Sequence, residues 1–448
     1  MELLKLLILA VLLINSSAYK ILVVVSLPGK SHGILGEGIV RHLINAGHEN
    51  LLKDTNQTFD VLLIEYTYQD LNAGFSAVYD CPYIWFSPLE PHWMVLRLID
   101  ELPNPAYVSD SASNNAPPLN FKERVKELFN QINGILLKKY YIESLENKYY
   151  DTYIVPHVRS RNRPVPSLTE LKYNASLMLG NSHASLGEAT RLPQSYKPIG
   201  GYHIEKNVKP LPDNLKKLMD NAEHGVIYFS MGSNLRSDTL PEKTIQNLLK
   251  IFGELKQTVI WKFERDLPKR PKNVHNTHWA PQQGILAHPN CLFFISHGGL
   301  LSTTEAVHFG IPMIIIPGMA DQYVNADRAV RKGFAIQVDL SFSMDVDLNR
   351  AIQEMLTEPK YKVKAKEVSL IYHDRPVSPE VELVHWVEHV VRTQGAPLLR
   401  SPALMMPWYQ KCYLDLFAIL VVFTAIVLIL KTICKMGSRK SYYNKKNK

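Results

Sequence analysis

Runs of apolar residues alternate along this chain with stretches whose apolar positions recur at helical spacing. In the first half, the β-branched run 21–25 precedes a helical stretch, 34–46, and the run 61–64 precedes another, 71–79. Such alternation predicts parallel α/β layers. The stretch 121–150 is long, aromatic-rich and helical in period, so we expect its apolar stripe to lie in the core.

The second half repeats the pattern after a connector with proline and glycine, 198–212. Four apolar runs separated by helical stretches are the strand candidates: 226–229, 259–261, 292–295 and 313–316. In doubly wound sheets, ligands bind beyond the carboxyl ends of the strands, where loops enter helices. The loops after these strands are therefore the places to look for chemistry.

The N-terminal residues predict a targeting segment. Lys5 precedes an apolar run, 6–14, and small residues follow at 16–18, which is typical of a signal peptide and its cleavage site. The run is too short for a membrane helix, which needs about 20 apolar residues. We therefore expect residues 1–18 to direct the chain into the secretory pathway.

The C-terminal residues predict a membrane anchor. An uninterrupted apolar stretch, 416–430, can extend to 413–434 if the flanking polar side chains reach outward, and the tail 435–448 is basic without an acidic residue. Basic residues beside a span mark the cytosolic side, so we expect a single-pass type I arrangement with a lumenal body. The last four residues, 445–448, resemble a dilysine retrieval signal, which predicts the endoplasmic reticulum membrane as the location.

The net charge of +8 arises almost entirely beside this anchor. All but one of these charges come from seven residues after Leu430: Lys431, Lys435, Arg439, Lys440, Lys445, Lys446 and Lys448. The basic balance therefore reflects membrane topology and gives no support for nucleic-acid binding. Four cysteines, of which Cys412 and Cys434 flank the span, predict no disulfide framework or metal cluster. Asn56 and Asn174 begin sequons that fit a lumenal glycoprotein.

The loop after the third strand candidate of the second half carries the clearest chemistry. His297, Gly298 and Gly299 follow that strand, and Ser302 to Glu305 open a helix. Glycines let a ligand approach the backbone, and the N–H groups at a helix start attract a phosphate. Ser302 and Glu305 fit a capping box equally well, in which they only satisfy the helix end. The local pattern leaves both interpretations open.

Three further loops carry polar or aromatic groups. Trp279 can stack on a flat base beside Gln282 as a ribose ligand, although the core is the commoner place for an isolated tryptophan. Asp321 and Gln322 can bind sugar hydroxyls, or Asp321 can be the N-cap of the next helix. Ser233 ends a turn of small residues that can approach a phosphate.

Together, the order and spacing of these residues closely resemble the signature of the UDP-glycosyltransferase family. The resemblance extends from Lys20 to the tail, includes Gly47 and His48, and is densest over 225–326. It implies the GT-B fold, an α/β architecture of two Rossmann-like domains facing a cleft. We expect an N-terminal acceptor domain, a C-terminal UDP-sugar domain, and helices that return towards the N-terminal domain and the membrane: 19–200, 201–375 and 376–412.

The resemblance also implies a role for each residue of the donor site. Trp279 stacks on uracil, the backbone of Ala280 reads the edge of the base, and Gln282 and Glu305 hold the ribose. Leu301 departs from some relatives, mainly plant ones, which have asparagine there, but it matches the animal pattern. The diphosphate and the transferred sugar are bound by the remaining residues: Ser233, His297, Gly298, Gly299 and Ser302 for the former, Asp321 and Gln322 for the latter.

The resemblance places the catalytic base in the loop after the first strand. His32 is expected to take the proton from an acceptor hydroxyl as its oxygen attacks the anomeric carbon, which inverts the anomer. A carboxylate should orient His32; Glu65 is favoured and Asp70 is the alternative. N–H groups and His297 are expected to meet the charge on the leaving UDP. No metal and no cofactor are expected, since the UDP-sugar is a co-substrate.

The chain is shorter than the family pattern in its N-terminal domain. After residue 49, relatives continue into a second strand and several tens more residues, whereas this chain soon reaches Phe59. At least one strand and its helix are expected to be missing, which would expose a strand edge and apolar helix faces. We expect a transferase that folds less stably than its relatives or, alternatively, a nucleotide-sugar-binding member with weak or no activity.

The expected reaction transfers a hexose to a small lipophilic alcohol or phenol, as in detoxification. UDP-glucose is the favoured donor because the signature is insect-like; UDP-glucuronate is second and would need a cationic partner. A nicotinamide enzyme is disfavoured because Gly-x-Gly-x-x-Gly is absent after the first strand. The expected partners are the two substrates and the membrane, without nucleic acid, and the sequence leaves a homo-oligomer open.

Overall fold

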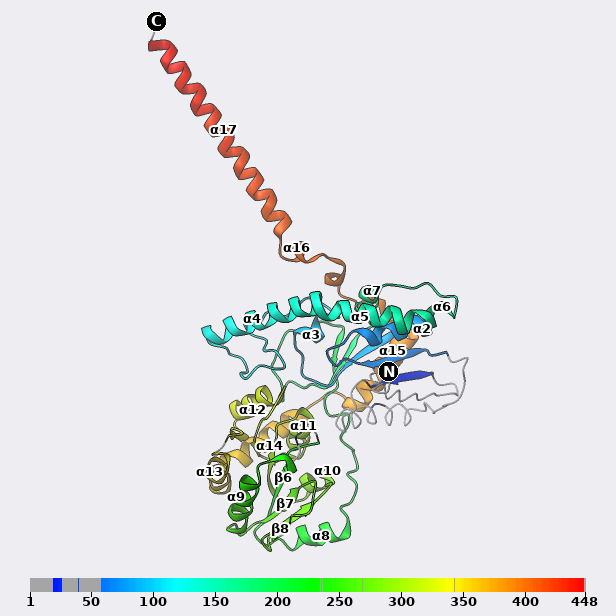
Figure 1. The fold of residues 1–448 in the computed structure, drawn as a ribbon, viewed down its shortest axis with the longest axis vertical. Coiled ribbons are helices and arrows are strands. Elements are labelled where there is room, and N and C mark those ends of the chain that lie inside the picture. The colour runs from blue at the N-terminus through cyan, green and yellow to red at the C-terminus, as the bar shows by residue number, and fades with distance from the viewer. Residues whose placement is uncertain are drawn as a thin grey trace. The chain divides into compact units, whose positions relative to one another are not determined.

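The computed structural model describes residues 19–25, 39 and 58–446, except 234, 236, 268 and 342, with side chains up to 435. It divides into two units, Met1–Arg400 and Ser401–Lys448. The first unit contains two parallel sheets covered by helices (Figure 1), which confirms the α/β class. The predicted signal peptide, His32, the helix 34–46 apart from Ile39, and the junction after residue 49 lie outside the described residues.

The sheet of the N-terminal lobe has the order β1-β2-β3-β4-β5 and is parallel throughout. Its strands are β1 (Ile21–Val24), β2 (Val61–Glu65), β3 (Tyr83–Ser87), β4 (Met178–Gly180) and β5 (Tyr196–Pro198). Every residue of β1, β2 and β3 is buried, as in strands covered on both faces. The strand predictions at 21–25 and 61–64 are confirmed.

The sheet of the C-terminal lobe is also parallel and has the order β11-β10-β9-β6-β7-β8. Its strands are β6 (Val226–Ser230), β7 (Thr258–Lys262), β8 (Val274–Thr277), β9 (Cys291–Ser296), β10 (Met313–Ile315) and β11 (Ala335–Gln337). All four strands predicted from the second half are confirmed. The chain builds outwards from β6 to β8 and then crosses to β9, so the strand order reverses between β6 and β9. In this topology the reversal marks the ligand crevice.

Helices cover both sheets. In the N-terminal lobe they are η2 (Leu71–Ala73), α2 (Gly74–Tyr79), α3 (Trp93–Leu96), α4 (Phe121–Leu137), η3 (Lys138–Ile142), α5 (Glu143–Tyr149), η4 (Tyr150–Ile154), α6 (Val155–Arg159) and α7 (Leu168–Lys172). In the C-terminal lobe they are α8 (Asp213–Asp220), η5 (Ser237–Thr239), α9 (Glu242–Gly253), α10 (Gln282–Ala287), α11 (Leu300–Phe309), α12 (Gln322–Arg331), α13 (Met344–Thr357) and α14 (Lys360–His373).

The last α-helix of the first unit belongs to the N-terminal lobe although it follows the C-terminal lobe in sequence. Leu383, Val387 and Val390 of α15 (Pro379–Arg392) pack in one cluster with Ile21 and Val61 of the N-terminal sheet. A short helix, η6 (Pro397–Leu399), ends this unit. The chain therefore passes between the two lobes twice, once before and once after the C-terminal sheet.

The second unit is helical. It contains η7 (Pro402–Met405), α16 (Trp408–Lys411) and α17 (Leu414–Lys446). The part Leu414–Lys435 is long and apolar enough to cross a membrane, and none of its apolar window is buried in the protein. It corresponds to the span predicted at 413–434.

The prediction that 121–150 is helical is confirmed, but its apolar stripe is not in the core. From α4 to α6 the chain forms one helical run, in which η3 and η4 are π-helical (Figure 1). Its buried polar positions are Glu127, Gln131, Lys138 and Glu146. The exposed apolar positions form what we call the outer face: Phe121, Val125, Leu128, Phe129, Ile132, Leu136, Leu137, Tyr140, Tyr141, Leu145, Tyr149 and Tyr153.

Candidate active site

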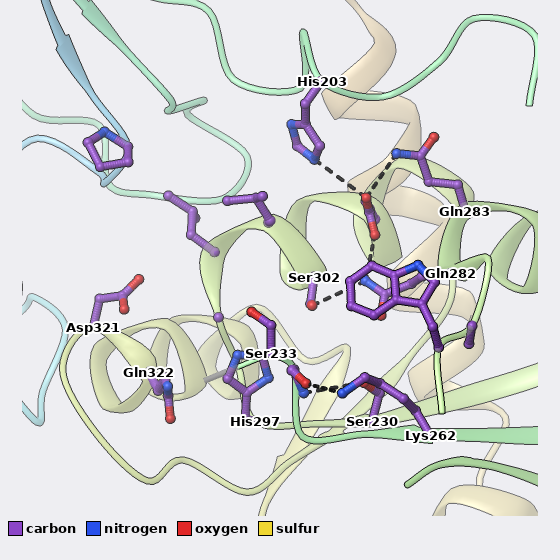
Figure 2. A pocket seen from close by; sticks show the side chains of 18 of the residues that line it. His203, Ser230, Ser233, Lys262, Gln282, Gln283, His297, Ser302, Asp321 and Gln322 are labelled. Atoms are coloured by element: carbon purple, nitrogen blue, oxygen red, sulfur yellow. Dashed lines mark hydrogen bonds and ion pairs between the residues drawn. The ribbon is translucent and has the colours of Figure 1, made fainter. Parts of the chain in front are cut away.

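A cavity of about 580 Å³ lies at the reversal of strand order in the C-terminal sheet (Figure 2). Ser230 and Gly232 enter it from the end of β6, and His297 and Gly299 from the loop after β9. The N-terminal lobe adds an aromatic and apolar side: Tyr66, Tyr68, Pro88 and Leu89. Among the sequence-predicted donor residues, those lining the cavity are Ser233, Trp279, Ala280, Gln282, His297, Gly299, Ser302, Glu305, Asp321 and Gln322.

Glycine is required around His297. A Cβ on Gly232, which has a φ of +83°, would lie 2.5 Å from Cε1 of His297. A Cβ on Gly299 would lie 2.5 Å from Nε2 of the same ring. Gly298 has a φ of +81°, and a Cβ there would lie 2.6 Å from Ile315. The loops after β6 and β9 can therefore pack against the imidazole of His297 only because these positions lack side chains. The same lack of side chains leaves their backbone accessible to a ligand.

His297 is uncharged at neutral pH. Burial lowers the pKa of His297 to about 4, and the nearby charge of Lys262 acts in the same direction. A neutral imidazole can donate one N–H to a phosphate oxygen but supplies no positive charge.

The capping-box interpretation of Ser302 and Glu305 is wrong. The helix α11 begins three residues earlier than expected, at Leu300, with Gly299 as its N-cap and no side-chain cap. Ser302 and Glu305 therefore lie inside the first turns, on the side of the cavity. The free N–H groups at the start of α11 are left for a ligand, as in other anion-binding helix ends.

Lys262 is a cavity residue that the sequence analysis missed. It ends β7, and its Nζ donates to the carbonyl oxygen of Gly232 at 2.6 Å and to Oε1 of Glu264 at 2.5 Å. The same Nζ lies 5.8 Å from the ring centre of Trp279. It is thus the cation nearest to the glycine turn among the described lining residues. Its position at the carboxyl end of a strand was the only signal in the sequence.

Trp279 is not a core residue. It follows β8, and half of its surface (50%) is exposed while its ring lines the cavity. The neighbouring Ala280 is buried. A half-exposed indole beside a backbone segment can accept a flat base on its face.

Glu305 is held in a network of amides. Nε2 of Gln282 donates to Oε2 of Glu305 at 2.6 Å, and Nε2 of Gln283 donates to Oε1 at 3.0 Å. Gln282 also donates to Oγ of Ser302 at 3.2 Å and accepts from the hydroxyl of Tyr228 at 3.3 Å. Burial raises the pKa of Glu305, and the two glutamine hydrogen bonds partly oppose this. Gln283 was missed by the sequence analysis because one glutamine beside another gives no separate signal.

His203 also reaches Glu305 and was missed. It lies in the connector after Gly200 and Gly201, and its Nε2 is 3.6 Å from Oε1 of Glu305. The preceding residue, Tyr202, is buried in the core cluster of the N-terminal lobe, where its ring meets Phe86 edge-on. The connector therefore joins the core of one lobe to the carboxylate in the cavity of the other.

Asp321 and Gln322 stand at the start of α12 (Figure 2). Asp321 occupies the N-cap position but makes no side-chain cap; its Oδ2 accepts from Nδ2 of Asn325 at 2.8 Å. Oε1 of Gln322 accepts from the N–H groups of Gly318 and Met319 at 2.8 and 3.1 Å. These bonds fix the loop that forms this end of the cavity.

The proposed partners of His32 lie in different surroundings. Glu65 ends β2 and is buried, and Val24 pairs with Ile64, so the segment after β1 leaves the sheet beside Glu65. Asp70 is buried among three cations of its own lobe, whose nitrogen atoms lie close to its carboxylate: Arg97 at 3.0 Å, Lys138 at 3.3 Å and Lys172 at 3.6 Å. These cations occupy Asp70. The pairing of Glu65 or Asp70 with His32, which lies outside the described residues, stays a prediction.

Comparison with known proteins identifies the family. The family described as "UDP-glucoronosyl and UDP-glucosyl transferase" matches residues 42–448. The chain belongs to the UDP-glycosyltransferase family. It is similar to UDP-glycosyltransferase UGT5 of Dactylopius coccus, with 36% identity over 392 residues, covering 85% of this chain and 71% of that protein. It also resembles rat UDP-glucuronosyltransferase 2B15, with 32% identity over 346 residues, 77% of this chain and 63% of that protein.

A solved structure supports the fold. Spinosyn forosaminyltransferase SpnP superposes with a TM-score of 0.50 at 14% identity, covering 75% of this chain and 76% of that chain. Together with the two parallel sheets, this confirms the expected GT-B architecture. Members of the UDP-glycosyltransferase family are transferases. The cavity at the strand reversal is the candidate active site because most of the predicted donor residues line it.

Proposed function

We propose that this UDP-glycosyltransferase moves a neutral hexose, glucose in first place, from its UDP-sugar to a hydroxyl of a small lipophilic alcohol or phenol, with inversion. The supporting observation is the cavity at the reversal between β6 and β9. There a glycine-bounded turn, the start of α11 and a half-exposed indole line one space. These three features match the diphosphate, its charge and a flat base.

Each part of the UDP-sugar has its own proposed ligands. Trp279 and the backbone of Ala280 bind the base, and Glu305 with Gln282 binds the ribose. The turn residues Ser233, His297, Gly298 and Gly299, with Ser302, hold the diphosphate, while Asp321 and Gln322 hold the sugar. Lys262, which is paired with Glu264, adds a cationic donor beside the glycine turn, where the neutral His297 offers only an N–H. The proposal needs no metal.

The sugar end of the cavity supports a neutral sugar over a glucuronate. Asp321 places a carboxylate beside Gln322, where a glucuronate would meet like charge. The described cations of the lining, Lys209 and Lys262, come from the connector and from β7 rather than from this loop. UDP-glucose should therefore outperform UDP-glucuronate as a donor.

Acceptors are proposed to enter from the side of the N-terminal lobe. Tyr66, Tyr68, Pro88 and Leu89 give that side an aromatic and apolar character suited to a lipophilic alcohol or phenol. We also propose that α17 anchors the lumenal body in the endoplasmic reticulum membrane, since Leu414–Lys435 can span a bilayer and a basic tail follows it.

The test uses the full chain in detergent with UDP-glucose and a phenolic acceptor. Release of UDP is expected in the wild type, and His32→Ala should abolish turnover while leaving UDP affinity unchanged. Turnover that survives in His32→Ala would remove this residue from the mechanism. A wild type that binds UDP but never turns over would instead support a nucleotide-sugar-binding relative without catalysis.

A further inference from the structure

Tyr68 combines a strained backbone with a place in the cavity wall. It lies in the loop between β2 and η2 and has a φ of +64°, in the left-handed region that bulky residues rarely adopt. Its side chain lines the cavity of the candidate active site. Strained residues of this kind persist only where surrounding contacts hold them, and they cluster at ligand sites. The position is therefore a candidate for a role in substrate binding.

Contacts at both ends of Tyr68 hold this conformation. Nζ of Lys138 donates to the carbonyl oxygen of Tyr68 at 3.3 Å and to Oε1 of Glu146 at 2.9 Å. The hydroxyl of Tyr68 lies 3.0 Å from Oγ of Ser111, which donates to Oδ1 of Asp110 at 3.1 Å. The backbone is thus held from the helical run α4–α6 and the ring from the loop before α4. Together, these contacts restrict the direction of the side chain.

The ring of Tyr68 faces the cavity rather than the core. Tyr66, two residues earlier, packs in the core and is 3% exposed, whereas Tyr68 is 42% exposed. Side chains two positions apart share a face in an extended strand, so the left-handed turn gives Tyr68 a different direction. The rings of Tyr66 and His92 lie 6.5 and 6.0 Å from that of Tyr68, tilted by 55 and 49°, so neither is stacked on it. A flat ligand can therefore stack on this ring.

The phenol of Tyr68 stands between the acceptor side and the sugar end of the cavity. Partial burial raises the pKa of Tyr68; the hydrogen bond with Ser111 opposes this, and the charges of Asp321 and Asp110 raise the pKa further. Asp321 is the proposed sugar ligand at the start of α12 and lines the same cavity. An acceptor hydroxyl must approach the anomeric carbon of the sugar held there. The acceptor therefore has to lie beside the ring of Tyr68.

We propose that Tyr68 determines acceptor specificity, because its ring stacks on planar phenols and disfavours puckered alicyclic alcohols. Lys138 and Ser111 are positioning residues, since they act through Tyr68. A planar ring meets an aromatic face over its whole area, whereas a puckered ring makes fewer contacts with it. The inference rests on the proposed function and narrows its acceptors from lipophilic alcohols or phenols to flat aromatic ones.

The experiment compares two acceptors with the same carbon skeleton, 2-naphthol and decahydro-2-naphthol. Each is supplied with saturating UDP-glucose to the full chain in detergent. The readout is the ratio of the two kcat/KM values, in which changes in donor binding or in the amount of folded protein cancel. Tyr68→Gly removes the ring and suits the left-handed backbone. Tyr413→Gly is the matched control, because Tyr413 is also left-handed, with a φ of +55°, and lies in the second unit.

The ratio of 2-naphthol to decahydro-2-naphthol should fall by about two- to twelvefold in Tyr68→Gly and stay unchanged in Tyr413→Gly. Tyr68→Asn covers the case in which glycine loosens the loop or prevents folding, since asparagine tolerates the left-handed conformation. It should show the same fall. Tyr68→Phe keeps the ring and should retain more of the selectivity than either variant. Transfer to decahydro-2-naphthol shows that a variant is folded.

Several results would overturn the proposal. An unchanged ratio in Tyr68→Gly and Tyr68→Asn would show that the ring does not select the acceptor, although the transferase reaction would stand. An equal loss of transfer to both acceptors would assign the ring to the sugar or to folding. A fall in Tyr68→Phe as large as in Tyr68→Gly would assign selectivity to the hydroxyl. A wild type that transfers glucose to neither acceptor would refute the proposed function itself, which distinguishes the two failures.

Discussion

The two lobes of the first unit have the same parallel architecture and apolar clusters on both faces of the sheet, but they differ in where charged and exposed apolar residues lie. In the C-terminal lobe, apolar residues fill two clusters on the faces of the sheet, and the polar residues of the cavity stand on loops at the strand ends. In the N-terminal lobe, Asp70, Lys138 and Lys172 are buried together while the outer face is exposed. The C-terminal lobe thus presents polar groups to a ligand, whereas the N-terminal lobe buries charged groups and exposes an apolar face.

From this difference we expect substitutions in the two lobes to affect different properties: ligand binding in the C-terminal lobe and folding stability in the N-terminal lobe. The C-terminal lobe places its recognition groups on a well-packed apolar support, so their loss should affect ligands more than folding. The N-terminal lobe depends on a buried charge cluster, so the loss of one charge should affect folding first. Four substitutions test this contrast.

The largest effect is expected for Asp70→Asn. Burial by itself would raise the pKa of Asp70, but Arg97, Lys138 and Lys172 outweigh it and lower the pKa below its usual value. Removing the negative charge takes the carboxylate partner from the buried guanidinium of Arg97, whereas Lys138 and Lys172 keep Glu146 and Glu143. The loss should cost about 3–5 kcal/mol of unfolding free energy. Urea unfolding of the detergent-solubilised chain measures this loss.

The pH dependence of Asp70 supplies a second readout. Because its folded pKa is lowered, its contribution is present above the usual carboxyl pKa and disappears as the pH falls through the folded value. The wild type should therefore lose stability on acidification, and Asp70→Asn should lack this component. As a control, Asp347→Asn breaks an exposed pair with Arg350 in the C-terminal lobe and should cost no more than about 1 kcal/mol. Equal losses in both variants would contradict the contrast.

Glu90→Gln should have the next largest effect. Burial raises the pKa of Glu90 from 4.5 to about 7, although Arg328 and Lys332 of the C-terminal lobe oppose it. Since the folded protein retains a proton that the unfolded chain has lost, stability is complete below pH 4.5 and decreases as the pH rises through about 7. Glutamine mimics the protonated form, so the variant should be more stable than the wild type at alkaline pH by up to about 3 kcal/mol.

Thermal unfolding at acidic and alkaline pH checks this expectation. The difference between wild type and Glu90→Gln should vanish below the usual carboxyl pKa and grow as the pH rises. The same difference at every pH would show that Glu90 acts through its shape or hydrogen bonds. In that case, the charge of Glu90 next to Arg328 and Lys332 would not contribute to the difference in stability between the lobes.

Trp279→Ala tests the other side of the comparison. The indole is half exposed, so unfolding should change little, whereas loss of stacking should weaken UDP binding by about 1–3 kcal/mol, or roughly five- to 150-fold. Titration calorimetry with UDP measures the change. Trp408→Ala removes a more exposed indole in the second unit and should leave UDP affinity unchanged. A stability loss in Trp279→Ala that matched Asp70→Asn would place this residue in the core.

The strands and helix ends differ in how well they could be predicted from the sequence. The strands 226–229, 259–261, 292–295 and 313–316 could be predicted because each is an apolar run between polar loops. By comparison, β4, β5 and β11 have three residues each, too few for a periodic signal. The start of α11 was misplaced because Ser302 and Glu305 imitate a cap, while the true cap is a glycine without a side-chain bond.

Two classes of feature could not be predicted from local pattern. Helical spacing in 121–150 identifies a stripe but carries no information on whether the stripe meets core, water or lipid. Lys262 and His203 are single polar residues whose partners, Gly232 and Glu305, are 30 and about 100 positions away. Only the folded chain brings such pairs together, so their roles follow from distance in space alone.

The smallest effect is expected at the seam between the lobes, for His203→Ala. Its Nε2 lies 3.6 Å from Oε1 of Glu305, the proposed ribose ligand, and the connector also anchors Tyr202 in the N-terminal core. If His203 positions Glu305, its loss should weaken UDP binding by about 1 kcal/mol, roughly fivefold. The loss should disappear with a deoxy-ribose analogue of UDP that lacks the hydroxyl bound by Glu305. His203→Gln, which keeps a donor, should recover part of the affinity. Equal losses for UDP and for both its 2′-deoxy and 3′-deoxy analogues would mean that His203 only supports the connector, and the lobes would then be coupled by packing alone.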